Sequence, residues 1–336
     1  MNEKIKFGLI IPQGWFIDLP SELSSIEQFE LIKKYAIEAE EIGYDSIWLF
    51  DHLHTMPRIE FKSVFECWTT LTALAMCTRK VGLGQIVTCN YYRQPTILAK
   101  MASILDVISK GRLEFGIGAG WYEHEFYGYG FDFPKPSIRI GMLEEAVQII
   151  KLMWTQDKVN FNGKYYKIKN GINFPKPIQK PHPPILIGGR GEKLTLKVIA
   201  KYANRFNIPH ASLEEYKRKL SILKEHCLNV GRNFNEIEKT LRADIIIGLN
   251  EKEVKEIKER IIKDGRNKKY ISGEKWEDIP EEEYFNSRIV GTPDECIEKI
   301  KEYIELGVDY FILYFPYMIE NNLHVLFAKE VIPKFK

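Results

Sequence analysis

Apolar positions along the chain follow two different spacings in turn. Short apolar runs such as Ile5–Ile11 and Ser46–Phe50 are typical of strands buried on both faces. Between these runs, apolar residues recur at the spacing of a helix that buries one face, as they do from Ile26 to Ala39 before Gly43. The pattern therefore predicts strands and helices that alternate along the chain.

The alternation predicts about eight strand–helix units, roughly the number that closes a parallel (β/α)8 TIM barrel. An open doubly wound sheet is the alternative, but its first strand should run into a Gly-x-Gly-x-x-Gly turn, which IIPQGWF lacks. The further strands are expected at 81–89, 112–118, 185–189, 205–208, 241–249 and 310–315, with a helix at 192–202 among the intervening segments.

Two stretches interrupt the alternation. After the fourth strand, residues 119–136 predict an ordered loop, and a helix (138–154), a hairpin turned at Asn162-Gly163 and a proline-rich arm follow. The highly charged residues 250–290 predict a solvated helix and a charged insertion before the last unit. We expect the whole chain, 1–336, to form a single domain.

Composition narrows the class of protein. A net charge of +2 gives no reason to expect nucleic acid or a membrane as partner. Five cysteines without a Cys-x-x-Cys pair disfavour a disulfide framework and fit a reducing compartment. The first apolar run is too short to span a membrane and lacks a cleavage pattern, so we expect a cytoplasmic protein.

In a barrel of this kind, chemistry gathers at the carboxyl ends of the strands. The turn Gly188-Gly189-Arg190-Gly191 precedes a helix and could hold a phosphate through backbone N–H groups and the helix dipole, or it could be a tight turn without a ligand. Small residues at the end of the fourth strand would let a flat ring lie against the backbone. The remaining candidates at strand ends are Asp51, His52, Thr88, Asn90, Gly118, Gly120, Trp121, Glu123, His124 and Glu125.

The sequence FDHLHTM leaves a metal site open, because His52 and His54 could supply two ligands and His210 a third. No acidic partner follows the eighth strand, which disfavours a metallohydrolase. Cys89 is expected to be a small buried residue and not a nucleophile.

Taken together, three segments closely resemble the luciferase-like monooxygenase superfamily, and within it the branch of probable coenzyme F420-dependent oxidoreductases. They are GYDSIWLFDHLHT, the stretch from FECWTTLTALAMC to GIGAGWYEHEFYGYG, and FPKPIQKPHPPILIGGRGEKLTLKVIAKYANRFN. IVGTPDECIEKIKEYIELGVDYFILYF fits the last unit of the same family.

The resemblance implies a flavin-type ring over the strand ends. Asp51 and His52 would then contact the deazaflavin region, with His52 moving a proton, and Gly188 and Gly189 would bind the cofactor phosphate. A non-prolyl cis peptide bond is implied behind the ring, near Gln85-Ile86.

One departure from the resemblance concerns the substrate. The sugar-phosphate dehydrogenases of the family carry an acidic glutamate where Trp121 stands here, and a tryptophan where Met56 stands here. A glucose-6-phosphate type of substrate is therefore not expected, and Glu123, His124 or Glu125 could replace the acid.

We expect hydride transfer between F420 and a small organic substrate. An FMN-dependent monooxygenase fed by a separate reductase is the alternative cofactor assignment, and a cofactor-binding protein without turnover is a further one. The chain is also expected to form a homodimer, as relatives commonly do.

Overall fold

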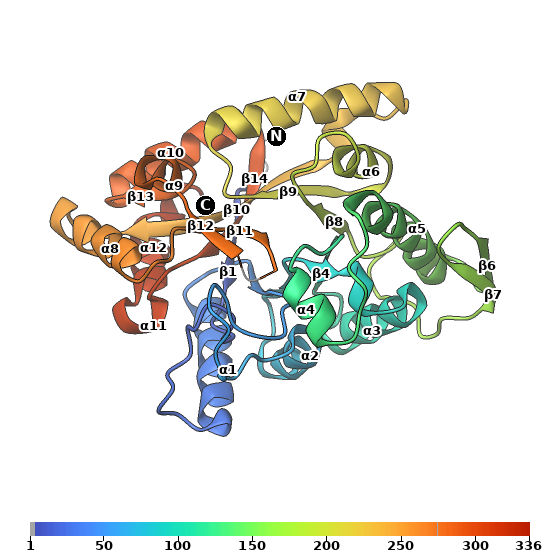
Figure 1. Cartoon of the computed structure of the whole chain (residues 1–336), viewed down its shortest axis with the longest axis horizontal. Coiled ribbons are helices and arrows are strands. Elements are labelled where there is room, and N and C mark those ends of the chain that lie inside the picture. The colour runs from blue at the N-terminus through green and yellow to red at the C-terminus, as the bar shows by residue number, and fades with distance from the viewer. Residues whose placement is uncertain (1–3, 274) are drawn as a thin grey trace.

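The computed structural model describes residues 4–273 and 275–336, and in this part of the chain eight parallel strands form a closed barrel (Figure 1). Each strand pairs in parallel with its neighbours, and the pairing of β9 with β10 closes the ring. The TIM-barrel prediction is confirmed. In barrel order the strands are β10 (Glu238–Ile247), β14 (Val308–Tyr314), β1 (Lys6–Ile10), β2 (Ser46–Leu49), β3 (Gly82–Gln85), β5 (Leu113–Gly118), β8 (Ile185–Gly188) and β9 (Arg205–Pro209).

Helices surround the barrel, and their ends follow local signals in the sequence. Ser24 and Glu27 form a reciprocal capping box at the start of α1, and Pro95 occupies the first turn of α3. No described helix is long and apolar enough to cross a membrane. The outer helices are α1 (Ser25–Glu41), α2 (Cys67–Cys77), α3 (Pro95–Ile108), α5 (Pro136–Thr155), α6 (Thr195–Tyr202), α7 (Leu213–Asn229), α8 (Glu251–Lys263), α10 (Pro293–Glu305) and α12 (Leu323–Glu330).

The barrel interior is filled by large side chains and is not a pore. Trp48 is fully buried there, and a Cβ at Gly8 or at Gly84 would overlap its ring. Glycine on the strands either side of β2 therefore makes room for the tryptophan. Ile10, Leu186, Tyr310 and Ile312 belong to the same inner cluster. A larger apolar cluster joins the strands to the outer helices.

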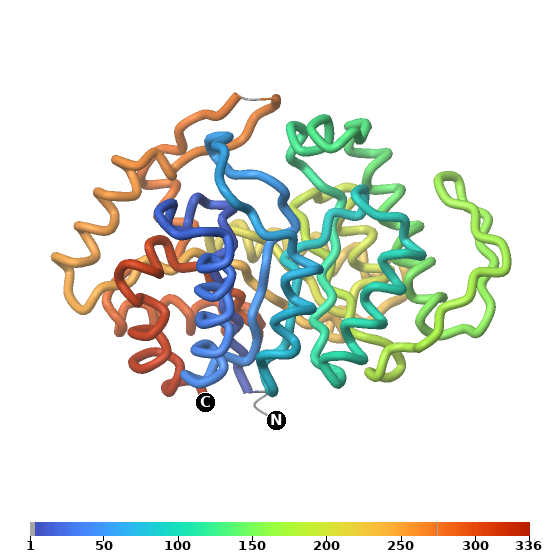
Figure 2. Tube along the Cα trace, turned by 90° about the horizontal axis from the view of Figure 1, so that it is seen from below, coloured from blue at the N-terminus to red at the C-terminus, as the bar shows by residue number. Residues whose placement is uncertain are grey.

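The segments that interrupt the barrel lie largely at one end of it. Figure 2 shows the chain around residues 53–65, 123–136, 268–273 and 275–278 projecting from one end, with the C-terminus at the other. The hairpin of β11 (Lys268–Ser272) and β12 (Lys275–Asp278), followed by α9 (Glu281–Asn286) and β13 (Ile289–Gly291), forms the charged insertion. Residue 274 of that insertion lies outside the described residues.

Several expected boundaries differ from the structure. Residues 119–136 are not only a loop, because they contain α4 (Glu123–Gly128). The hairpin of β6 (Val159–Asn162) and β7 (Lys167–Gly171) turns over residues 163–166, which is wider than an Asn-Gly turn. The helix expected from residue 192 begins at Thr195, since the glycine turn extends to that point.

Candidate active site

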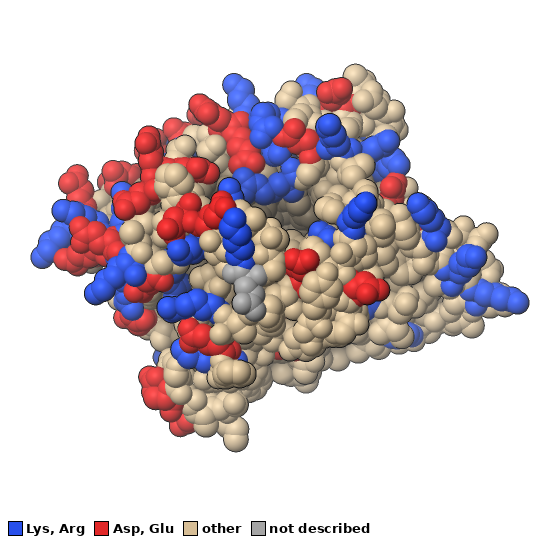
Figure 3. All heavy atoms as spheres, in the orientation of Figure 1, with Lys and Arg blue, Asp and Glu red and all other residues tan. Residues whose placement is uncertain are grey.

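A large cavity opens at the carboxyl ends of the barrel strands, with a volume of about 1150 Å³. This volume is at the upper end of small-molecule sites, so it can hold a ring cofactor together with a substrate. Figure 3 shows the hollow near the centre of this face, with basic side chains along part of its rim. Residues from the ends of β2, β5, β8, β9 and β10 line it, together with the β11–β12 hairpin.

His52 follows β2 and lies at the wall of this cavity, where two neighbouring side chains hold its ring in place. Its Nδ1 atom is 2.7 Å from Oε2 of Glu125, a fully buried carboxylate on α4. The imidazole ring also stacks on Trp15, with ring centroids 3.9 Å apart and an interplanar angle of 6°. These two contacts fix both the position and the plane of the imidazole.

Whether the Glu125 carboxyl is ionised decides which ring nitrogen of His52 carries a proton and which one can accept a proton. Burial on its own raises the pKa of the Glu125 carboxyl, but the charge and hydrogen bond of His52 and the N–H of Leu53 (2.8 Å) outweigh it, so the pKa lies below its ordinary value. Tyr92 donates a further hydrogen bond at 3.0 Å. An ionised carboxylate only accepts, so Nδ1 of His52 carries the proton and Nε2 is left free to exchange one.

Asp51, the neighbour of His52, is held by the protein on both of its oxygen atoms. Arg93 donates to Oδ2 and Oδ1 at 2.7 and 2.9 Å, and the backbone N–H of Cys89 donates to Oδ2 at 2.8 Å. Asp51 reaches the cavity wall but is only 2 % exposed. In this structure it therefore ties the end of β2 to the residues after β3.

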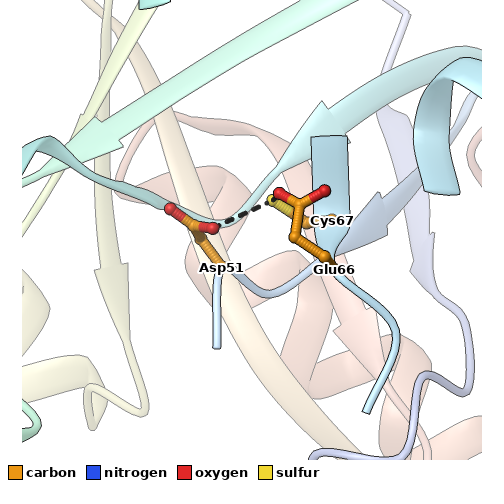
Figure 4. Close-up of side chains that lie close together, drawn as sticks. All are labelled: Asp51, Glu66 and Cys67. Carbon is orange, nitrogen blue, oxygen red and sulfur yellow. Dashed lines mark hydrogen bonds between the residues drawn. The ribbon is translucent and has the colours of Figure 1, made fainter. Parts of the chain in front are cut away.

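Asp51, Glu66 and Cys67 lie close enough together to suggest a metal site (Figure 4). A guanidinium already pairs with both carboxylates, since Arg93 contacts Glu66 at 2.7 Å as well as Asp51. Glu66 also caps the N-terminus of α2, and burial raises the pKa of the Cys67 thiol well above its usual value. A protonated thiol is not a metal ligand, so these contacts favour a structural ion-pair cluster.

The chain between β3 and β4 (Thr88–Cys89) bulges toward the cavity. The non-prolyl cis peptide bond lies at Ile86-Val87, one bond later than expected, and Ile86 and Val87 line the cavity. Gln85, Thr88 and Asn90 are buried, and the structure places them behind this lining. Their expected contacts with a cofactor stay predictions.

Glycine at the end of β5 is required by the bulge. A Cβ at Gly116 would overlap the carbonyl oxygen of Gln85, and a Cβ at Gly118 would come within 2.7 Å of Val87. Gly120 has a φ of +74°, which favours glycine, and a Cβ there would be 2.6 Å from Sγ of Cys89. Gly118, Ala119 and Gly120 line the cavity and present backbone to it, so a flat ring could lie against them.

Aromatic side chains cover the mouth of the cavity beside His52. Trp121 is 40 % exposed and stacks on Tyr122, with centroids 5.2 Å apart. Tyr270 of β11 meets the Trp121 ring edge-on at 5.2 Å, and Trp276 of β12 lies 6.5 Å away. The charged insertion thus contributes an apolar, aromatic wall to the site.

The three titratable candidates on α4, Glu123, His124 and Glu125, have three different environments. Glu123 lines the cavity, and its Oε2 accepts a hydrogen bond from the N–H of Gly273 at 2.8 Å, which joins α4 to the β11–β12 hairpin. His124 lies away from the lining, with its Nδ1 2.9 Å from Nε2 of His54. Glu125, which the sequence offered only as a substitute acid, is the carboxylate that contacts His52.

The glycine turn after β8 lies at the cavity wall, before the N-terminus of α6. Gly188, Gly189 and Arg190 line the cavity, and Gly191 follows them. Gly189 has a φ of +155°, and a Cβ at Gly189 or at Gly191 would come within 2.7 Å of Thr195 at the start of α6. The turn can therefore approach a ligand closely, as a phosphate site requires.

The sequence reading missed a group of basic residues on the other side of the cavity: Arg242, Arg266 and Arg288. Arg242 was hidden because the predicted strand, 241–249, places it at the amino end, whereas the search for functional groups was confined to carboxyl ends. β10 is longer than its neighbours, so Arg242 is level with Pro209, the last residue of β9. The signal that could have revealed Arg242 is the length of the apolar run in the sequence, because this run is longer than those of the two neighbouring strands.

Several proteins with similar sequences or folds carry the names of redox enzymes. The F420-dependent glucose-6-phosphate dehydrogenase of Amycolatopsis mediterranei is 26% identical over 333 residues, which cover 93% of this chain and 97% of that protein. Among solved structures, an F420-dependent secondary alcohol dehydrogenase with an F420-acetone adduct superposes with a TM-score of 0.80 at 20% identity, covering 99% of this chain and all of the other.

The coenzyme F420-dependent tetrahydromethanopterin reductase of Methanopyrus kandleri superposes with a TM-score of 0.76 at 22% identity, again over 99% of this chain and 100% of that one. The profile of the luciferase-like monooxygenase family matches residues 6–310. The chain therefore belongs to the luciferase-like monooxygenase family and is an oxidoreductase of that family.

Proposed function

We propose that this protein catalyses hydride transfer between coenzyme F420 and a small organic substrate, with His52 as the group that exchanges the substrate's proton. The observation that carries the proposal is the buried Glu125 carboxylate bonded to Nδ1 of His52, because it leaves Nε2 as the nitrogen that can exchange a proton, on a residue that lines a cavity of cofactor size. The similarity to proteins that are named F420-dependent dehydrogenases supports the choice of F420 as the cofactor.

The residues present fit a deazaflavin with a phosphate-bearing side chain. Gly118–Gly120 offer a flat stretch of backbone for the ring, and Ile86 and Val87 form the bulge beside it. The glycine turn, with Arg190 and the N-terminus of α6, would hold the phosphate. When bound, F420 accepts or donates the hydride, while the protein contributes orientation and a dry site.

His52 would balance the proton of the reaction. When an alcohol is oxidised, its carbon loses a hydride and its hydroxyl loses a proton, which Nε2 of His52 can accept. In the reverse direction the imidazolium returns that proton to the carbonyl oxygen. Glu125 stabilises the imidazolium that forms, since its carboxylate remains ionised in contact with Nδ1.

The proposal is tested by titrating the purified protein with F420 and, separately, with FMN, and by following the fluorescence of each ligand. We expect saturable F420 binding; tight FMN binding without F420 binding would refute the choice. F420 absorbance is then followed against a panel of alcohols and carbonyl compounds. His52→Asn should abolish turnover, whereas the control His54→Asn, two residues later on the same loop, should retain it.

An FMN-dependent monooxygenase is the second candidate function. The type II Baeyer-Villiger monooxygenase component of Pseudomonas putida, solved with FMN, superposes with a TM-score of 0.75 at 19% identity over 99% of this chain and of that one. A ring-plus-phosphate site suits FMN as well. Oxygen uptake with chemically reduced FMN separates the two, because a reduced deazaflavin consumes hardly any oxygen.

A further inference from the structure

A second basic site lies in the cavity, separate from the glycine turn. Arg242 and Arg288 are 4 % and 7 % exposed, and both line the cavity. They share one carboxylate: Nη2 of Arg242 is 3.0 Å from Oδ1 of Asp244, and Nε of Arg288 is 3.3 Å from Oδ2. Two buried guanidinium groups thus face a single aspartate.

The neighbouring groups leave this positive charge uncompensated. His210 accepts a hydrogen bond from Arg242 at Nε2, and burial together with Arg242 and Arg288 holds the pKa of His210 well below its usual value, so it is neutral. The carboxylate of Glu215 is paired with Arg190 at 2.6 Å. Nε of Arg242 has no hydrogen-bond partner among the described residues. Uncompensated buried charge is costly, so an anion at this place would be stabilised.

The site lies within reach of a molecule that also contacts His52. In barrel order, β1 and β14 separate β2, which precedes His52, from β10, which carries Arg242. The two residues are bridged by aromatic rings: Trp15 stacks on His52, Phe50 lies 4.4 Å from Trp15, and the Arg242 guanidinium lies 5.4 Å from the Phe50 ring. A small molecule lying across these rings can contact both ends.

We propose that Arg242 and Arg288, bridged by Asp244, bind a phosphate or carboxylate group of the substrate, so that the protein acts on an anionic alcohol or carbonyl compound. The proposal rests on the proposed function, because it assigns the remaining part of the same cavity. The aromatic wall of Trp121, Tyr270 and Trp276 would cover the apolar body of that substrate. The negatively charged glutamate tail of F420 has the same chemistry, so the test must separate the two sources.

The test is calorimetric titration of the F420-loaded protein with inorganic phosphate. Arg242→Gln and Arg288→Gln should each weaken phosphate binding by about tenfold or more, since each removes a charged hydrogen-bond donor. Arg288→Lys should retain most of the binding because it keeps the charge. Arg79→Gln, an exposed arginine after α2, is the matched control and should bind as the wild type does. Thermal unfolding of each variant checks that it is folded.

A parallel titration uses F420 with its glutamate tail and F420 without it. Equal affinities of wild type and Arg288→Gln for both forms, with weakened phosphate binding, support a substrate subsite. A loss confined to tailed F420, with phosphate displaced by that cofactor, would give the site to the tail and overturn the proposal. Phosphate binding that is absent, or equal in wild type and Arg288→Gln, would also overturn it. If F420 does not bind at all, the proposed function fails, and the phosphate titration of the cofactor-free protein still decides the anion site.

Discussion

Replacement of Glu125 by glutamine should turn the His52 ring from one tautomer to the other. In the wild type, Oε1 accepts from the N–H of Leu53 at 2.8 Å, and Oε2 accepts from Nδ1 of His52 at 2.7 Å and from Tyr92 at 3.0 Å. A glutamine amide can keep its oxygen toward the backbone donor only by pointing its NH2 group at His52. Nδ1 must then accept, and the proton moves to Nε2, where it blocks proton uptake from the cavity.

The magnitude of the effect follows from the bonds that change. One charge-assisted hydrogen bond is replaced by a neutral one inside a buried site, so Glu125→Gln should lower the free energy of unfolding by about 2 kcal/mol. Loss of the proton-accepting nitrogen should reduce kcat/KM by about 10²- to 10⁴-fold, the usual contribution of general acid–base catalysis.

Two measurements check this without knowledge of the substrate. Correlation spectra of 15N-labelled histidine report which ring nitrogen of His52 carries the proton, and urea unfolding reports the stability. Glu123→Gln, two residues earlier on α4 and partly exposed, is the matched control and should change neither. A His52 ring that stays protonated at Nδ1 in Glu125→Gln would refute the reasoning.

Three further predictions concern stability and thiol chemistry. The pKa of the Glu125 carboxyl in the folded protein lies below its ordinary value of 4.5, so the ionised carboxylate stabilises the fold above pH 4.5. This stabilisation is lost as the pH falls through the folded pKa. The stability difference between wild type and Glu125→Gln should therefore shrink over this pH range, which urea unfolding at each pH will show. Gly116→Ala should lower the urea midpoint by the equivalent of about 1–3 kcal/mol, because its Cβ would overlap the carbonyl of Gln85; an unchanged midpoint would contradict the close approach. Of the five cysteines only Cys77 is exposed, so a thiol reagent should label one site in the folded protein and five after denaturation.

The barrel could be predicted from the sequence because its signal is repeated many times. Each strand is a short apolar run between amphipathic helices, and an error at one boundary does not alter the topology. The helix start expected at residue 192 was wrong by three positions, yet β8 and the glycine turn stayed in place. Asp51, His52 and Gly188, which were selected because they stand at strand ends, accordingly line the cavity.

The partners of these residues could not be predicted, since they depend on which face a short helix presents. α4 spans only Glu123–Gly128, too short for a periodic pattern, and it directs Glu125 inward to His52 while Glu123 meets the β11–β12 hairpin. The pairing of His124 with His54 has the same origin. Arg93 is likewise far from Glu66 in sequence, and only the fold brings them together with Asp51.

The contacts of Glu123, Glu125 and His52 suggest a reason for the tryptophan at position 121. The resemblance to sugar-phosphate dehydrogenases implied an acid at this position, and its absence raised the question of which group replaces it. Glu125 does not line the cavity, and its carboxylate contacts His52, which does. Glu123 accepts a hydrogen bond from the backbone N–H of Gly273. Under the proposed function, proton exchange beside the cofactor ring would therefore fall to His52, and Glu125 would set the tautomer of its imidazole. Trp121 is then free to serve as apolar wall, which suits a substrate bound through its charged end and not through sugar hydroxyls.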